Sequence, residues 1–228
     1  MYSKSYVLDY LWQHSRFAYS CLVQAEQLFR EGKGYASVIV LFSCMENIAK
    51  SVVNDYESNL ANVYGSLYER EYLTDKEYDF LSRDACSLRK IRNRYAHANC
   101  AAISLIVNES GHDVYWPLTE DDTSLLIYEK IGDIVFNLIL KIVCADMIEQ
   151  VRNSICVNMD DAIGKCDLRF KLFTLRELLV VKGYPEDYFD GVTGIPEHAL
   201  FRMLDNAPNI AEQVPFFQAL ASEEMSEE

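Results

Sequence analysis

The residues of this sequence whose types could carry out chemistry are concentrated in one short segment, S-L-R-K-I-R-N-R-Y-A-H, at positions 87–97. Between Arg83 and His97 the chain has five basic side chains and one acidic one, Asp84, which is a local net charge of +4. The five basic residues are Arg83, Arg89, Lys90, Arg92 and Arg94. Like charges at helical spacing destabilise a helix. The segment therefore needs compensation, either from an acidic neighbour or from a polyanionic ligand.

The pattern predicts that this segment belongs to one helix, which begins at the capping box formed by Thr74 and Glu77 and runs to about Ala98. At about 100° per residue, the face of His97 is shared by Arg83, Lys90, Asn93 and Arg94. The buried stripe is then Leu81, Leu88, Ile91 and Tyr95, roughly 120–200° away from His97. Arg92 lies on the rim of that stripe. A partly desolvated guanidinium at such a place needs a fixed anionic partner.

A preceding helix, expected over residues 35–56, offers that partner. Glu46 shares its face with apolar and aromatic side chains, so its carboxylate is expected to be at least half buried and to be paired or protonated. Lys50, one helical turn further on, could pair with Glu46 as an ordinary surface ion pair. Arg92 is the candidate from across the bundle. The sequence leaves both pairings open.

Helical periodicity dominates the elements that must position these residues. Helices are expected over residues 5–31, 35–56, 60–72, 74–98, 120–153 and 167–182, followed by short helical pieces at 196–206 and 214–221. One β-hairpin is expected at about 103–118, because a β-branched run is followed by the turn sequence N-E-S-G-H-D and then by V-Y-W-P-L. The predicted fold is all-α, an antiparallel up-down helical bundle with a small β-hairpin insertion. Residues 1–184 are predicted to form the bundle domain, and residues 185–228 an acidic C-terminal extension with short helices.

Charge and cysteine usage restrict the classes of function. The net charge is −14, of which residues 185–228 contribute −9, with Arg202 as their one basic residue. Such a chain is not expected to coat nucleic acid or anionic membranes nonspecifically. The seven cysteines are odd in number and form no C-x-x-C pair, which favours reduced core residues of a cytoplasmic protein and gives no metal-ligand spacing. The apolar runs are interrupted by Ser43, Glu46, Lys141 and Asp146, so no membrane-spanning segment and no signal peptide are expected.

The stretch from Arg92 to His97 resembles the R-x4-6-H motif of the HEPN superfamily (higher eukaryotes and prokaryotes nucleotide-binding domains), with the polar residue Asn93 directly after the motif arginine. The chain is also similar to that family in its upstream E-x3-K element, Glu46 to Lys50, on the second predicted long helix. The resemblance covers roughly residues 5–153.

The resemblance implies a metal-independent endoribonuclease without cofactors, of the toxin or antiviral-defence type, whose partners would be RNA and a cognate antitoxin or sensor protein. His97 would be the general acid/base, Arg92 would stabilise the phosphate, and Asn93 would bind the backbone or fix the imidazole. The products would be a 2′,3′-cyclic phosphate and a 5′-hydroxyl. Glu46 and Lys50, together with Arg83, Arg89, Lys90 and Arg94, would support the site or bind RNA. The alternative is a catalytically silent HEPN-like module that binds nucleotide or protein.

The family also implies a homodimer in which two motif helices form one composite cleft. On an ideal helix, Arg92 and His97 point about 140° apart, so one protomer does not easily present both to one phosphate. A two-fold composite site would relieve this, and so would a distortion of the helix near Tyr95. The acidic tail, residues 185–228, is expected either to be solubilising surface or to be autoinhibitory by competing with RNA.

Overall fold

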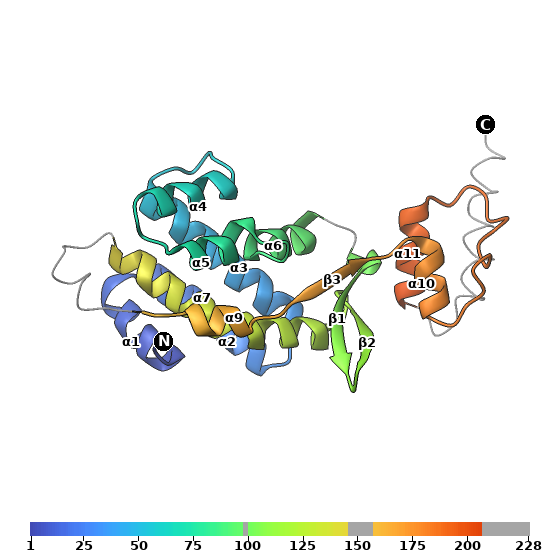
Figure 1. Cartoon of the computed structure of the whole chain (residues 1–228), viewed down its shortest axis with the longest axis horizontal. Coiled ribbons are helices and arrows are strands. Elements are labelled where there is room, and N and C mark those ends of the chain that lie inside the picture. The colour runs from blue at the N-terminus through green and yellow to red at the C-terminus, as the bar shows by residue number, and fades with distance from the viewer. Residues whose placement is uncertain (98–99, 146–156, 207–228) are drawn as a thin grey trace. The chain divides into compact units, whose positions relative to one another are not determined.

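The computed structural model of this chain describes residues 1–97, 100–145 and 157–206, and shows a mainly α-helical protein with a small three-stranded sheet (Figure 1). The chain divides into two compact units. The first comprises Met1–His97 and Glu120–Arg169, and the second comprises Ala98–Thr119 and Phe170–Glu228. This division differs from the predicted boundary at residue 184, because the hairpin and the segment just before that boundary group with the C-terminal residues.

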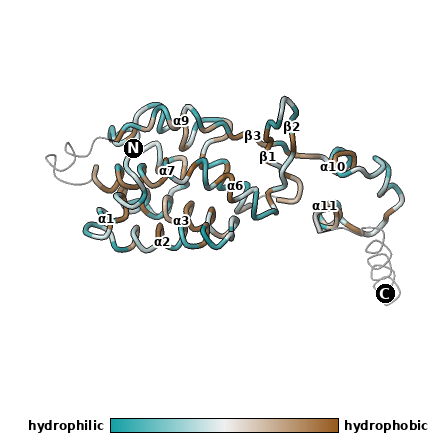
Figure 2. The backbone as a smooth tube through the Cα atoms, turned by 90° about the horizontal axis from the view of Figure 1, so that it is seen from below, coloured by the Kyte–Doolittle hydropathy of each residue, from teal (hydrophilic) through white to brown (hydrophobic). Residues whose placement is uncertain are grey.

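The first unit, here called the helical unit, is organised around its third helix. Its elements are α1 (Lys4–His14), α2 (Arg16–Arg30), α3 (Gly34–Val53), α4 (Leu60–Glu69), α5 (Asp75–Tyr78), the π-helical turn η1 (Asp79–Arg83), α6 (Leu88–His97), α7 (Asp121–Ala145) and α9 (Asp160–Lys165). Helix α3 packs most extensively against α2 and α7. Brown and teal stretches alternate along the helices in Figure 2, as expected for helices that bury one face.

Helix α3 is as apolar as a membrane-spanning helix, but it lies in the core of the helical unit. Among the described residues it is the one helix long and apolar enough to cross a membrane by length and composition, where the sequence had indicated none. Half of its most apolar window is buried, and its core side chains Val38, Leu41 and Met45 are fully enclosed. Its apolar side chains are thus used in packing against α2 and α7, as is usual for a helix in the core of a helical domain.

Two of the predicted long helices are interrupted. The helix expected over residues 5–31 is wrong as one element, because Ser15 ends α1 and caps α2 by accepting a hydrogen bond from the Ala18 amide at 3.4 Å. The helix expected from Thr74 has the predicted capping box, but its course to residue 98 is wrong. It passes through η1 and breaks before α6. The break is fixed by the buried Ser87, whose hydroxyl donates to the Ser82 carbonyl at 3.1 Å.

The second unit contains the predicted hairpin and an additional strand. Strands β1 (Ile103–Glu109) and β2 (His112–Pro117) pair antiparallel, with Leu105 opposite Trp116, which confirms the hairpin. The turn has Ser110 and Gly111 at positive φ. Strand β3 (Arg169–Leu172) pairs on the other side of β1, giving the order β2-β1-β3. The helix predicted over 167–182 is therefore wrong in its first half, because Thr174 starts α10 (Leu175–Val181) with its own capping box.

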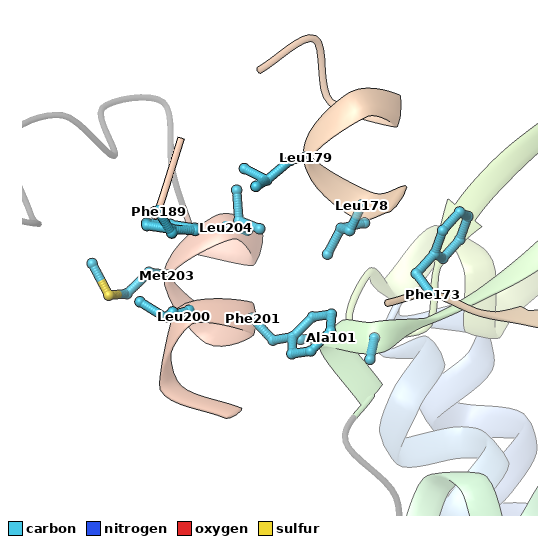
Figure 3. Packing of buried hydrophobic residues seen from close by; sticks show 10 residues of the cluster. Ala101, Phe173, Leu178, Leu179, Phe189, Leu200, Phe201, Met203 and Leu204 are labelled. Carbon is cyan, nitrogen blue, oxygen red and sulfur yellow. The ribbon is translucent and has the colours of Figure 1, made fainter. Parts of the chain in front are cut away.

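The second unit has its own apolar core, shown in Figure 3. Leu178 and Leu179 of α10 face Leu200 and Leu204 of α11 (Glu197–Asn206), which confirms the short helix predicted at 196–206. The helix predicted at 214–221 lies outside the described residues. Residues 185–206 therefore contribute to a core and are not only solubilising surface.

Candidate functional site

Helix α6 is held in the helical unit by its apolar stripe. Leu88, Ile91 and Tyr95 are buried, as the periodicity predicts. The Tyr95 hydroxyl is 2.9 Å from the Ser124 hydroxyl of α7, and the Tyr95 carbonyl accepts a hydrogen bond from Tyr35 of α3 at 3.2 Å. These contacts fix the rotation of α6 about its axis and thereby decide where its polar side chains emerge.

Arg92 finds its anionic partner across the bundle. Its guanidinium donates to Glu46 Oε2 at 2.8 Å, and Lys50 Nζ lies 3.1 Å from Glu46 Oε1. The two pairings that the sequence left open are both present, so one carboxylate bridges two cations. The side chains are 28 % (Arg92), 19 % (Glu46) and 20 % (Lys50) exposed, which confirms the expected partial burial.

Two further side chains adjoin this ion-pair network. The Asn93 side-chain carbonyl accepts a hydrogen bond from Arg92 at 3.3 Å, so Asn93 helps to orient the guanidinium. Tyr64 of α4 is fully buried, and its pKa is raised first by burial and then by the negative charge of Glu46. The positive charges of Arg92 and Arg89 act in the opposite direction on that pKa.

Three other basic residues of the segment interact with the end of η1. Arg89 donates to the Ser82 carbonyl at 3.2 Å, and Lys90 donates to the carbonyls of Arg83 and Asp84 at 3.1 and 2.8 Å. Cations are favourable beside the carbonyl end of a helical turn. Arg83 itself pairs with Asp79 and lies 4.7 Å from the ring of Tyr78. The local charge of +4 is thus compensated to a large extent by the protein itself.

The break between η1 and α6 also corrects the helical-wheel argument. Arg83 and His97 are not on one continuous helix, so their common face was a wrong inference. Arg94 is half-buried on α6. His97 is the last residue of α6, and its side chain lies outside the described residues, so its role stays a prediction.

A cavity of about 400 Å³ lies where α3, α4 and α6 meet. It is lined by five of the predicted site residues and by three residues at the start of α4, namely Glu46, Lys50, Arg89, Arg92 and Asn93 together with Asn59, Leu60 and Ala61. Three cationic side chains and one carboxylate give these walls a formal charge of +2, although the whole chain carries −14. The geometry therefore suits an anion.

The start of α4 was missed as part of the site. Asn59 is its N-cap, and the Asn59 side chain accepts a hydrogen bond from the Asn62 amide at 3.1 Å. An Asn directly before an apolar-periodic stretch is a sequence signal for a helix start. Nothing local to that signal indicates that the helix start lies beside Arg89 and Arg92.

The site cannot be assigned to a known class from its possible metal ligands or from its similarity to known proteins. Within the described residues, no three His, Cys, Asp or Glu side chains are grouped so that they could hold a metal ion. Comparison of the chain with family models, curated proteins and solved structures found no match. The functional argument therefore depends on the motif residues and on the geometry around them.

Proposed function

We propose that this protein is a metal-independent endoribonuclease of the HEPN type. One observation carries the proposal: the motif residues Arg92 and Asn93 line a positively charged cavity, and the 2.8 Å ion pair with Glu46 holds the arginine in place there. Preorganised donors of this kind stabilise charge as it develops on a phosphate. The proposal includes the up-down arrangement of the bundle helices that is typical of the family.

The chemistry follows from the residue types. His97 removes the proton from a ribose 2′-hydroxyl, and the 2′-oxygen attacks the adjacent phosphorus. The bond from phosphorus to the 5′-oxygen breaks, and an imidazolium returns a proton to that leaving oxygen. The products are a 2′,3′-cyclic phosphate and a 5′-hydroxyl. Arg92 donates hydrogen bonds to the phosphate oxygens, while Glu46 and Asn93 limit the orientations that its guanidinium adopts.

The proposal also requires a second copy of the chain. Arg92 and His97 belong to the same helix, α6, and are five residues apart, so they project about 140° apart around its axis. Two α6 helices related by a two-fold axis would bring the arginine of one protomer and the histidine of its partner to one phosphate. A toxin or antiviral effector in the cytoplasm, controlled by an antitoxin or sensor protein, is the cellular role that we propose.

The ion pair between Arg92 and Glu46 also favours a second candidate function, a catalytically silent binding module. Because Glu46 neutralises this guanidinium, Arg92 would contribute less charge to a reacting phosphate. A module that only binds nucleotide or protein would use the same surface without that contribution. The two functions differ in what they demand of His97, since only the nuclease requires its imidazole.

The test is cleavage of a mixed pool of transfer and messenger RNA in the presence of EDTA. Wild type is compared with His97→Ala and with the control His14→Ala, which changes an exposed histidine at the end of α1. Cyclic-phosphate ends that are lost only in His97→Ala support the nuclease. Absence of cleavage by wild type, both as the full chain and after removal of residues 207–228, which leaves α11 and the core of the second unit in place, would overturn it in favour of the binding module.

A further inference from the structure

The cavity between α3, α4 and α6 has features that the proposed cleavage step does not use. Lys50, Arg89 and the first turn of α4 lie in its walls, in addition to the motif residues. The Nε atom of Arg89 is buried and, among the described residues, makes no hydrogen bond, although the same guanidinium donates to Ser82 through another nitrogen. Among the described residues no acidic side chain pairs with Arg89, so its charge adds to the positive walls of the cavity.

The backbone of α4 adds donors of the same kind. The first amides of an α-helix have no acceptor within the helix. The Asn59 side chain accepts from the amide of Asn62. Within the described part of the chain no acceptor is found for the amides of Leu60 and Ala61, and both of these residues line the cavity. Free amides at a helix start favour an anion. Here they support a site that already has three cationic side chains.

The composition of the walls indicates which part of a nucleic acid would fit. The described lining contains three cationic side chains, the carboxylate of Glu46, two asparagines and two small or aliphatic residues, and no aromatic ring. Single-stranded binding sites that hold bases usually stack them on aromatic side chains. Contacts to phosphate and sugar, in contrast, come from basic side chains, amides and helix starts. The walls therefore match a backbone phosphate with its sugar and not a base.

We infer that this cavity is a phosphate-binding subsite that holds the backbone of the RNA substrate without reading its sequence. Lys50, Arg89 and the start of α4 bind the phosphate, and Arg92 forms the wall shared with the cleavage site. Naming RNA as the source of the phosphate rests on the proposed function, whereas the binding of a phosphate anion does not. Electrostatic binding of this kind weakens steeply with salt.

The test measures binding without cleavage. Inorganic pyrophosphate and eight-nucleotide 2′-O-methyl oligo-U and oligo-A, whose blocked 2′-oxygen cannot attack the phosphorus, are titrated into the full-length protein by calorimetry at low salt. The main variant is Ala61→Glu, because an acidic residue in the first turn favours the helix while it places a negative charge in the cavity. Lys50→Gln is the second variant. Its matched control is Lys33→Gln, since Lys33 also pairs with a glutamate, at 2.8 Å, but lies outside the cavity.

We expect both oligonucleotides to bind with similar affinity and to compete with pyrophosphate. Lys50→Gln should weaken binding by about tenfold, the loss of one charge-assisted hydrogen bond, and Ala61→Glu should weaken it further with an unchanged thermal midpoint. Lys33→Gln should bind as wild type does. Unchanged affinity in both cavity variants overturns the inference, and so does a strong preference between oligo-U and oligo-A.

The two proposals fail in different ways. Pyrophosphate binding that is lost in Ala61→Glu, in a protein that cuts no RNA, keeps the phosphate site and refutes the nuclease. Cleavage that depends on His97, in a protein whose phosphate affinity is unchanged by both Ala61→Glu and Lys50→Gln, keeps the nuclease and refutes the subsite.

Discussion

Replacing Glu46 with Gln tests whether one carboxylate organises the site. The substitution keeps the shape of the side chain and removes the charge that lies 2.8 Å from Arg92 and 3.1 Å from Lys50. Two cations then remain beside each other at one wall of the cavity without their common counter-ion. We expect the helical unit to lose stability and Arg92 to lose its fixed orientation.

The size of the effect follows from the burial of the pair. Removing one partner of a fully buried pair costs about 3–5 kcal/mol, whereas an exposed pair contributes about 0–1 kcal/mol. Glu46 and Arg92 are 19 % and 28 % exposed, so the pair lies between these limits. We expect a loss of about 2 kcal/mol in the free energy of unfolding, given these two limits. For a chain of this length that corresponds to roughly 4–8 °C in the thermal midpoint.

The assay is urea and thermal unfolding followed by circular dichroism, with Glu31→Gln as the matched control. Glu31 also pairs with a lysine at 2.8 Å, but its side chain is 41 % exposed, so solvent screens the pair and its loss should leave stability close to that of wild type. RNA cleavage or phosphate binding by Glu46→Gln is measured at a temperature where the variant is folded. A destabilisation no larger than that of the control would refute the reasoning that Glu46 is the common counter-ion of the site.

Three further predictions concern the framework around the site. Gly34→Ala should destabilise the helical unit by about 1–3 kcal/mol, because a Cβ at the start of α3 would overlap the backbone of α7. The control is Gly65→Ala in α4, where a Cβ meets only ordinary contacts. It should be neutral or stabilising in the same unfolding assay. Lys141→Met should lower the free energy of unfolding by about 3–5 kcal/mol, because it removes the partner of a buried carboxylate. That carboxylate, Glu77, is 1 % exposed and lies 2.7 Å from Lys141. A thermal midpoint within about 2 °C of wild type would contradict this prediction. Burial raises the pKa of the Cys166 thiol to about 11. Its alkylation by iodoacetamide in the folded protein should therefore be slow at pH 8 and should accelerate as the pH rises toward that value. Fast labelling at pH 8, measured by mass spectrometry, would contradict this prediction.

Local patterns were sufficient for several parts of this protein. The capping box at Thr74, the hairpin with its turn at Ser110 and the buried stripe of α6 each depend on residues that are neighbours in the sequence or lie one helical turn apart. The pairing of Glu46 with Arg92 could be named as a candidate from the sequence for a related reason. A carboxylate on an apolar face and an arginine on the rim of another have few ways to satisfy their charge.

Tertiary structure decided what local patterns leave equivalent. The periodicity did not indicate a break at residues 84–87, where the buried Ser87 donates to the Ser82 carbonyl of η1 and Arg83 is thereby separated from the face of α6. Residues 169–172 have an apolar content that suits a helix or a strand, and the free edge of β1 selected the strand.

The cavity between α3, α4 and α6 shows the same division most clearly. The sequence by itself determined its ingredients: the basic segment, the Glu46–Lys50 spacing and an asparagine at a helix start. That the start of α4 lies beside Arg89 and Arg92 was decided by the packing of α3, α4 and α6 around a shared core. The reason is physical. Hydrogen bonds and periodicity within an element act over a few residues, whereas the burial that brings distant elements together depends on the shape of the whole core.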